Sequence, residues 1–346
     1  MTAIKLSIII PVLNDAPELK RLLEQLAQQT LPGLEVLVAD GGSTDDSVAV
    51  AQNAGAHVIT SEPGRGRQMN AAAQVAQGEH WLFLHADSTL PHPQLLAESW
   101  QFMAQTLANH PRSAGHFALH FCDSMAKKRW YWPFWEKKTL LNRAECIHGD
   151  QGLWITHRFF TEIGGFDTTY PFLEDRRIAR EVTRWGQWVL LPGRLGTSTR
   201  RFDRETMVRR TLLNALIMVT HEIGHHEFLQ HAPDLYRQSH ASDRLKMSPF
   251  FHLLQRLIQA MPPDQRQAYW RAAGVLLRHA FWQLFFLLDV LSSVGKGRSR
   301  FACYHFYLKH LEPWSPRWFP DLLASTSARL VFHGLRLYFQ WSEGCR

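Results

Sequence analysis

Two aspartates stand where apolar runs end, and such ends are where a sheet can gather polar side chains around a ligand. Asp40 closes a short apolar run and is followed at once by two glycines, which let a backbone approach a ligand closely. Asp87 closes a second apolar run, and His85 would share its face in an alternating strand. Open α/β sheets hold ligands at the carboxyl ends of their strands, so we expect these three side chains to converge on one site.

If Asp40 is considered alone, the simpler interpretation is structural: the residue ends a strand at a capped turn that leads into a helix. Ser43 or Thr44 would then cap a helix that starts near Asp45. The second strand with the same ending favours a functional site, because two unrelated loops would seldom coincide in this way.

Two arginines could bind phosphate. Arg65 and Arg67 lie in a glycine-rich loop that leads into a helix. Loops of this kind offer backbone amides and guanidinium groups to phosphate, although basic glycine loops are also common on plain surfaces.

A different chemistry is suggested by His221–His225, a literal His-Glu-x-x-His sequence with two histidines on one helix face, as in zinc proteases. His231 stands where one protease class has its third zinc ligand, but Phe228 occupies the position of the glycine that turns that chain. On a continuous helix His231 would lie about 280° around the axis from His221, off the zinc face. A zinc metallopeptidase or metal-binding module centred on this segment is therefore the alternative function.

The order of the elements predicts an α/β domain followed by a helical region. Apolar strand-like runs alternate with helical patterns as far as Ile163, which is typical of a mostly parallel sheet covered on both faces. The predicted strands are 5–11, 35–40, 57–61, 81–87, 114–121, 152–156 and 188–191. The predicted helices of the first part are 18–28, 45–54, 67–77, 92–108 and 174–185. From about Asp203 the predicted helices are 205–230, 248–260, 264–291, 298–311 and 318–341.

Composition limits the class of protein. The 346 residues are 45% hydrophobic and 20% charged, as in a globular chain with room for one large and one smaller domain. The formal net charge of +7 favours anionic partners, but the chain lacks the motifs of nucleic-acid binding, so we expect no nucleic-acid partner. Cysteines 122, 146, 303 and 345 show no paired spacing, which fits a cytoplasmic location. We find no signal peptide and no run of roughly 18 uninterrupted apolar residues, 280–291 being nearest.

The motifs together resemble those of family 2 glycosyltransferases, and short bacterial members of that family in particular. The resemblance covers roughly residues 4–235. The matching pieces, in the family's order, are Ile9–Asn14, Asp40–Ser43, Gly64–Asn70, Leu84–Asp87, His148–Gly152, Gly164–Asp167, Leu173–Asp175 and Thr197–Arg201. The resemblance implies a GT-A fold, that is, an α/β nucleotide-diphospho-sugar transferase domain over residues 1–204. An all-helical C-terminal region would follow over 205–346, with family-like packing helices in 205–238 and an extension in 239–346.

The resemblance also implies roles for individual residues in an inverting, metal-assisted transfer of sugar from a nucleotide-diphosphate donor. Asp175, or less favourably Glu174, would be the catalytic base; helix-dipole complementarity is the structural alternative for this acidic pair. Asp87 would hold Mg²⁺ or Mn²⁺, with His85 in place of the family's first metal-binding aspartate. Asp150 and Gln151 would line the acceptor side. The residues expected to bind the nucleotide sugar are Pro11, Asn14, Asp15, Asp40, Gly41, Arg65, Arg67, Asn70, Ala86, Arg200 and Arg201.

The C-terminal region mixes aromatic residues with Lys and Arg. Most of these aromatics should form ordinary helical core, but such a mixture also suits a membrane interface. We therefore expect an unidentified acceptor that is lipid-linked or close to a membrane, with an anionic membrane surface on the cytoplasmic side as a further partner. A non-catalytic relative that binds a nucleotide sugar or a membrane is the third hypothesis.

Overall fold

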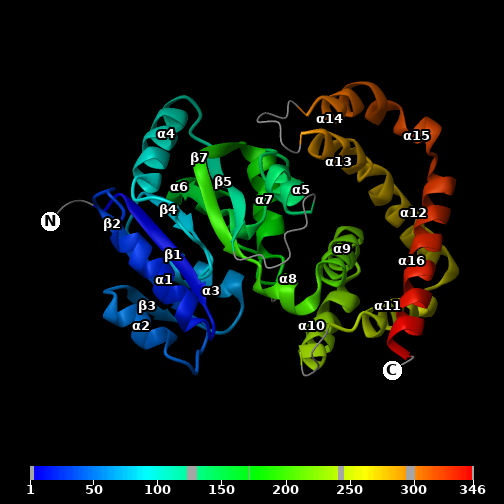
Figure 1. Ribbon diagram of the computed structural model, residues 1–346, viewed down its shortest axis with the longest axis horizontal. Coiled ribbons are helices and arrows are strands. Elements are labelled where there is room, and N and C mark those ends of the chain that lie inside the picture. The colour runs from blue at the N-terminus through cyan, green and yellow to red at the C-terminus, as the bar shows by residue number, and fades with distance from the viewer. Residues whose placement is uncertain (1–3, 123–130, 171, 241–244, 294–300, 345–346) are drawn as a thin grey trace. The chain divides into compact units, whose positions relative to one another are not determined.

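The computed structural model describes residues 4–122, 131–170, 172–240, 245–293 and 301–344. The chain divides into two compact units (Figure 1). The first unit contains Met1–Asp123 and Trp135–Thr199, and the second contains Ser124–Phe134 and Arg200–Arg346. This division falls at Thr199, a few residues before the boundary that we expected from the sequence.

The first unit is built on a seven-stranded mixed sheet with the order β3-β2-β1-β4-β6-β5-β7. β1, β2, β3 and β4 pair in parallel, β6 is antiparallel to both β4 and β5, and β5 pairs in parallel with β7. The predicted α/β class is confirmed. The strands are β1 (Leu6–Val12), β2 (Leu34–Asp40), β3 (His57–Thr60), β4 (His80–Phe83), β5 (Ser113–Cys122), β6 (Leu153–Thr156) and β7 (Gln187–Ser198).

Helices cover both faces of this sheet, as the apolar strand pattern predicted. On β1 the side chains alternate, so that Ile8 and Ile10 join a core with the leucines of α1, while Ile9 joins a second core with α3 and α7. The helices are α1 (Ala16–Ala27), α2 (Ser47–Asn53), α3 (Arg65–Ala73), α4 (Leu95–Asn109), α5 (Tyr131–Lys138), α6 (His157–Glu162) and α7 (Glu174–Trp185). Short 3₁₀ turns lie at Ala144–Cys146 and Gly149–Gln151.

Two local predictions are wrong. β4 ends at Phe83, and the chain then turns, with the Ser88 N–H donating to the His85 carbonyl at 3.0 Å; His85 and Asp87 therefore lie in a turn and not on one strand face. The second helix begins at Ser47, without Ser43 or Thr44 as its cap. Ser43 Oγ instead accepts from the Asn14 N–H at 2.9 Å, a partner 29 positions away that no local pattern reveals.

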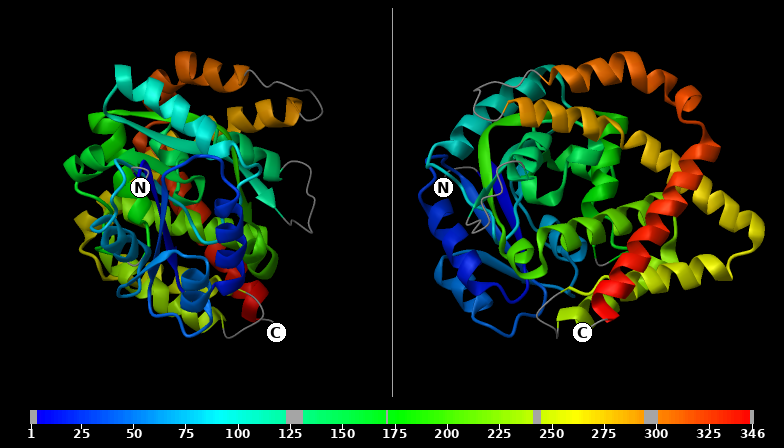
Figure 2. Two further views of the ribbon diagram at one scale, coloured as in Figure 1. Left: turned by 90° about the vertical axis from the view of Figure 1, so that its left-hand side faces the viewer. Right: turned by 45° about the vertical axis from the view of Figure 1, so that its right-hand side comes forward.

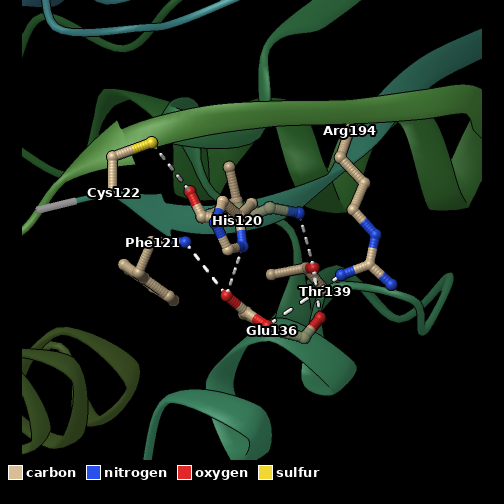
Figure 3. A network of polar contacts seen from close by, with 7 residues as sticks. His120, Phe121, Cys122, Glu136, Thr139 and Arg194 are labelled. Carbon is tan, nitrogen blue, oxygen red and sulfur yellow. Dashed lines mark hydrogen bonds and ion pairs between the residues drawn. The ribbon is translucent and has the colours of Figure 1, made fainter. Parts of the chain in front are cut away.

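β5 runs on past its short partner β6, and polar side chains complete its free edge. Glu136 Oε1 accepts from the Phe121 N–H at 3.1 Å, and Thr139 Oγ1 accepts from the Leu119 N–H at 2.9 Å (Figure 3). His120 Nδ1 lies 2.9 Å from the same Glu136 oxygen. These contacts satisfy backbone groups that an unpaired strand edge would otherwise leave open.

The second unit is helical in its described part. Figures 1 and 2 show α16 running beside α12. The predicted helical C-terminal region is confirmed. Its helices are α8 (Arg200–Glu205), α9 (Met207–Ile223), α10 (His226–His240), α11 (Ser248–Ala260), α12 (Pro263–His279), α13 (Trp282–Ser292), α14 (Ala302–Phe306), α15 (Ser315–Trp318) and α16 (Asp321–Gly344). A π-helical turn, Tyr307–Leu311, and a 3₁₀ turn, Glu312–Trp314, link α14 to α15.

Pro263–Ser292, which takes in α12 and α13, is long and apolar enough, by length and composition only, to cross a membrane. It is the one such segment among the described residues, and Ala280 and Phe281 interrupt it with a turn. A core helix of a soluble domain passes the same test.

Gln68 of α3 fixes the carboxyl ends of the neighbouring strands β1 and β2. Its buried amide Nε2 donates to the Val12 carbonyl at the end of β1 and to the Ala39 carbonyl near the end of β2, both at 2.8 Å. α3 thereby sets the spacing of the two loops that follow these strands.

We predict that Gln68→Met lowers the free energy of unfolding by about 1–3 kcal/mol, because the near-isosteric side chain loses two buried hydrogen bonds, although the Val12 carbonyl keeps the Gly41 N–H at 3.0 Å. Urea denaturation followed by circular dichroism measures this change. Gln74→Met, at an exposed position just after the same helix, is the matched control. Equal stability of both variants would show that the Gln68 amide does not hold the strand ends.

Candidate active site at the carboxyl edge of the sheet

The loops after β1 and β2 are tied together at the sheet edge. Asp40 is 3% exposed, and its carboxylate accepts from the N–H groups of Gly42 at 3.0 Å and Ser43 at 3.1 Å. Asn14, at a left-handed φ of 53°, accepts from the Thr44 N–H at 2.7 Å through Oδ1. The structure therefore brings Asn14 and Asp40 together, as the sequence predicted, and shapes a rigid rim from their two loops.

Gly149, in the 3₁₀ turn before β6, lies against the side chains of His85 and Asp175. A Cβ atom at this position would stand 2.9 Å from Nε2 of His85 and 3.9 Å from Oδ2 of Asp175. Only a glycine leaves room for the His85 ring here. Three segments distant in the sequence, the turn after β4, this 3₁₀ turn and the start of α7, thus meet at one point.

Arg65, the first residue of α3, joins the same group. Its Nε lies 3.0 Å from Oε1 of Glu174, and its Nη1 lies 3.5 Å from Nε2 of His85. Glu174 is 2% exposed, and burial raises its pKa although the Arg65 charge opposes the rise. Arg65 itself stays 41% exposed, so its remaining guanidinium surface is open to an anionic ligand.

Asp175 is held by the 3₁₀ turn. Its Oδ2 accepts from the Gly149 N–H at 2.9 Å and lies 3.8 Å from Nδ1 of His148. Burial alone would raise the pKa of Asp175, but His148, Arg65 and the Gly149 N–H outweigh it and lower the pKa below its ordinary value. Asp175 is therefore an ionised carboxylate at neutral pH.

Asp150 has the opposite electrostatic environment. Burial, reinforced by the charges of Asp175 and Asp87, raises the pKa of Asp150 to about 7, with Arg65 opposing. Its buried Oδ1 has no hydrogen-bond partner. Asp87 and Asp175 therefore lie close enough to Asp150 to disfavour its charge. With Glu174 these acidic side chains outnumber the arginines Arg65 and Arg176 that act on them.

This excess of charge fits a divalent cation. Carboxylate oxygens are the ligands that Mg²⁺ and Mn²⁺ accept, and Mg²⁺ is usually held by one or two carboxylates together with substrate phosphates. Among the described residues no group of three or more His, Cys, Asp or Glu side chains is arranged to hold a metal ion. Asp87 and Asp150, whose buried Oδ1 has no hydrogen-bond partner, are the carboxylates here that could hold such an ion together with a substrate.

Several predicted site residues lie elsewhere or serve the scaffold. Gln151 is fully buried, where Nε2 donates to the Cys146 carbonyl at 2.6 Å and Oε1 lies 3.0 Å from Nδ1 of His116. These contacts give Gln151 a part in the scaffold, and its place on the acceptor side stays a prediction. Asn70 exchanges two 3.0 Å hydrogen bonds with the backbone of Phe166 and so joins α3 to the loop before α7.

The remaining predicted residues are easily placed. Pro11, Gly41 and Ala86 are buried close to the ends of β1, β2 and β4, and Asp15 precedes α1 with its N–H bonded to Ser47 Oγ at 3.2 Å. Arg67 is exposed and pairs with Glu62 at 3.4 Å.

Arg200 and Arg201 begin α8 in the second unit. Arg200 is exposed, and the Arg201 side chain lies outside the described part of the chain. Their predicted contact with a diphosphate stays a prediction.

His148 and Gln68 were not predicted as site residues. Both sit inside recognised motifs, but their partners, Asp175 and the ends of β1 and β2, lie far away in the sequence. No pattern in the sequence reports such contacts.

The His-Glu-x-x-His segment does not form a zinc site. α9 ends at Ile223, and Gly224 takes a left-handed φ of 78°. The N–H groups of Gly224 and His225 close the helix by bonding the carbonyls of His221 at 3.0 Å and Thr220 at 2.8 Å, the pattern of a glycine-terminated helix. The two histidines therefore do not share one helix face, and our expectation of a continuous helix over 205–230 is wrong.

The comparisons with known proteins decide the family. The family model "Glycosyl transferase family 2" matches residues 7–152. A "PGL/p-HBAD biosynthesis glycosyltransferase" of Mycobacterium bovis (strain BCG / Pasteur 1173P2) is 31% identical over 185 residues, which are 51% of this chain and 68% of that protein. The chain belongs to glycosyltransferase family 2. The family that the sequence motifs resembled is thereby confirmed, and the protein is a glycosyltransferase.

Solved structures show only a distant likeness. A Staphylococcus aureus TarS fragment, residues 1–349 in complex with UDP, is 16% identical with a TM-score of 0.48, covering 96% of this chain and 92% of that one. The mannosyltransferase PcManGT from Pyrobaculum calidifontis, in complex with GDP-Man and Mn²⁺, is 17% identical with a TM-score of 0.47, covering 98% and 88%.

We predict that Asp150→Asn stabilises the protein in a pH-dependent way. The folded state keeps a proton on Asp150 up to about pH 7, whereas the unfolded chain loses it near pH 4, so the wild type loses stability relative to the variant as pH rises between these values. Below pH 4 the two proteins should be equal, and above pH 8 the variant should be more stable by on the order of 1–4 kcal/mol.

Urea denaturation in chelator-treated buffer at several pH values measures this difference. Asp46→Asn, an exposed aspartate of the same unit, is the control and should show no such dependence. A difference between Asp150→Asn and the wild type that stays constant from pH 4 to pH 8 would contradict the account of the three carboxylates.

Proposed function

We propose that the enzyme transfers a sugar from a nucleoside-diphosphate donor to an acceptor hydroxyl with inversion at the anomeric carbon. The observation that carries this proposal is the concentration of Asp87, Asp150 and Asp175 around Arg65 at the carboxyl edge of the sheet. A nucleotide-sugar transferase needs such an arrangement, because it must neutralise a diphosphate leaving group and remove a proton from the acceptor.

Donor binding would use the rim and the basic loop. The nucleoside would lie against the loops held by Asn14 and Asp40, and the exposed guanidinium groups of Arg65 and Arg67 would meet the phosphates. Asp87 and Asp150 would hold Mg²⁺ or Mn²⁺, and a bound ion would supply charge neutralisation for the diphosphate. This assigns Asp150 to the donor side and not to the acceptor side expected from the sequence.

Asp175 would be the base. Its lowered pKa keeps it ionised at neutral pH, and the Gly149 N–H fixes the position of its carboxylate. The acceptor oxygen would attack the anomeric carbon while its proton passes to Asp175, and the bond between that carbon and the diphosphate oxygen would break on the opposite face. Glu174 is less suited to this role, because it is buried and paired with Arg65.

The basic charge of the chain favours an acceptor that is lipid-linked or close to an anionic membrane surface on the cytoplasmic side.

A panel of nucleotide sugars, screened for thermal stabilisation with and without Mn²⁺, tests the proposed function. A donor should raise the melting temperature by mass action, and more strongly when Mn²⁺ is present. Stabilisation by no member of the panel, with the chain folded, would contradict the proposal.

We predict that Asp87→Asn abolishes metal-dependent donor binding while the fold stays intact, because the loss of one carboxylate removes half of the partial coordination shell. Calorimetric titration of the donor identified above, with and without Mn²⁺, measures the effect. Asp46→Asn should bind as the wild type does. Undiminished Mn²⁺-dependent affinity in Asp87→Asn would place the ion elsewhere.

We predict that Asp175→Asn lowers kcat by roughly 10²-fold or more, the scale of lost general-base catalysis, while the donor Kd changes little. Steady-state kinetics and donor titration separate the two quantities. Glu181→Gln, on the same helix, is the matched control. If Glu174→Gln causes the loss and Asp175→Asn does not, the two carboxylates have the reverse roles.

A further inference from the structure

α16 is packed against its own unit along one face only. Phe332 and Phe339 are buried, and their rings lie 5.5 Å and 5.8 Å from the ring of Phe251 on α11. Phe332 also contacts Trp270 of α12, with ring centroids 5.5 Å apart. These contacts fix which side of the 24-residue helix faces the unit.

The opposite side of α16 carries exposed apolar side chains along its length, interrupted by Thr326, Ser327 and Gly334, and we call it the outer face. Leu323, Leu330, Leu337 and Trp341 follow one another at intervals of seven, seven and four positions, so they line up along one side of the helix. They are 53%, 69%, 55% and 70% exposed. Val331 and Tyr338, 53% and 57% exposed, widen the stripe. Apolar surface of this extent calls for a covering partner.

The basic charge of this region lies outside the outer face, since Arg329 of α16 stacks over the Trp270 ring on the packed side at 5.6 Å. The two acidic residues of α16 stand near its ends, and each is paired with an arginine, Asp321 with Arg278 at 2.6 Å and Glu343 with Arg209. Between them the charged side chains are those of Arg329 and Arg336. Residues 200–346 as a whole hold 20 Lys and Arg against 11 Asp and Glu, whereas residues 1–199 hold 18 against 20. The net positive charge of the protein therefore belongs to this part of the chain.

We propose that the outer face of α16 lies in the interface of an anionic lipid membrane, with the helix parallel to the surface. A helix that exposes leucine and aromatic side chains along one side, in a region of net positive charge, suits insertion at the boundary between headgroups and acyl chains. The inference deepens the membrane part of the proposed function and rests on that part, not on the transfer chemistry.

The charge pattern favours lipid over a second copy of the chain. Two copies meeting through this stripe would bring two strongly basic regions together, whereas anionic lipid neutralises them. Trp341 and Tyr338 near the helix end suit the headgroup region, where amphipathic aromatic rings are enriched.

Co-sedimentation of the full chain with vesicles of phosphatidylcholine alone, or mixed with phosphatidylglycerol, tests the proposal. We expect binding to the anionic vesicles that weakens at high salt. The double variant Leu330→Glu/Leu337→Glu should bind at least ~10-fold more weakly. Gln265→Glu/Gln267→Glu adds the same charge at exposed positions of α12 and should bind nearly as the wild type does.

Because the substituted leucines and glutamines are all exposed, both double variants should keep the wild-type melting temperature and donor affinity. Donor affinity also distinguishes the membrane proposal from the proposed transfer chemistry, because vesicle binding and donor binding can each be absent without the other. Equal vesicle binding by the two double variants, or no binding by the wild type, would overturn the proposal. A dimer seen by light scattering in the wild type and lost in Leu330→Glu/Leu337→Glu would assign the face to a second copy and overturn it as well.

Discussion

The burial of Asp150 beside two further carboxylates is the constraint on which the chemistry of the sheet edge depends. Asp87 and Asp175 both disfavour a charge on Asp150, and Arg65 is the cation that opposes them. Such a group stays together only because rigid elements hold it, including Gly149, which leaves room for the His85 ring, and the α7 start that carries Asp175. Under the proposed function, a cation and a nucleoside diphosphate would complete this site.

The alternation of strands and helices was readable from the sequence because it depends on local hydrophobic periodicity. Asp40 was predicted at a strand end for the same reason, and parallel pairing of β1, β2 and β4 then brings the ends of these strands to one edge. The ends of elements were less predictable. β4 stops at Phe83 and α2 starts at Ser47 because backbone groups there bond across loops, as the Asn14 N–H does to Ser43.

Side-chain roles could be predicted only where the partner is near in the sequence. Gln151 lies next to Asp150 in one motif, yet it is buried against His116 of β5 while Asp150 faces the other carboxylates. The prediction of a zinc site at His221–His225 failed for the opposite reason. The His-Glu-x-x-His pattern is complete in the sequence, but Gly224 ends the helix between the two histidines. Their separation of four residues therefore does not place them on one helix face.

The central claim is that the protein supplies only part of a cation site and that a nucleoside diphosphate supplies the rest. Titration of Mn²⁺ followed by electron paramagnetic resonance, with and without UDP or GDP, measures this directly. The account predicts weak Mn²⁺ binding to the protein alone and binding at least ~10-fold tighter when the matching diphosphate is present. Tight Mn²⁺ binding without a nucleotide, or an affinity that neither nucleotide changes, would contradict it.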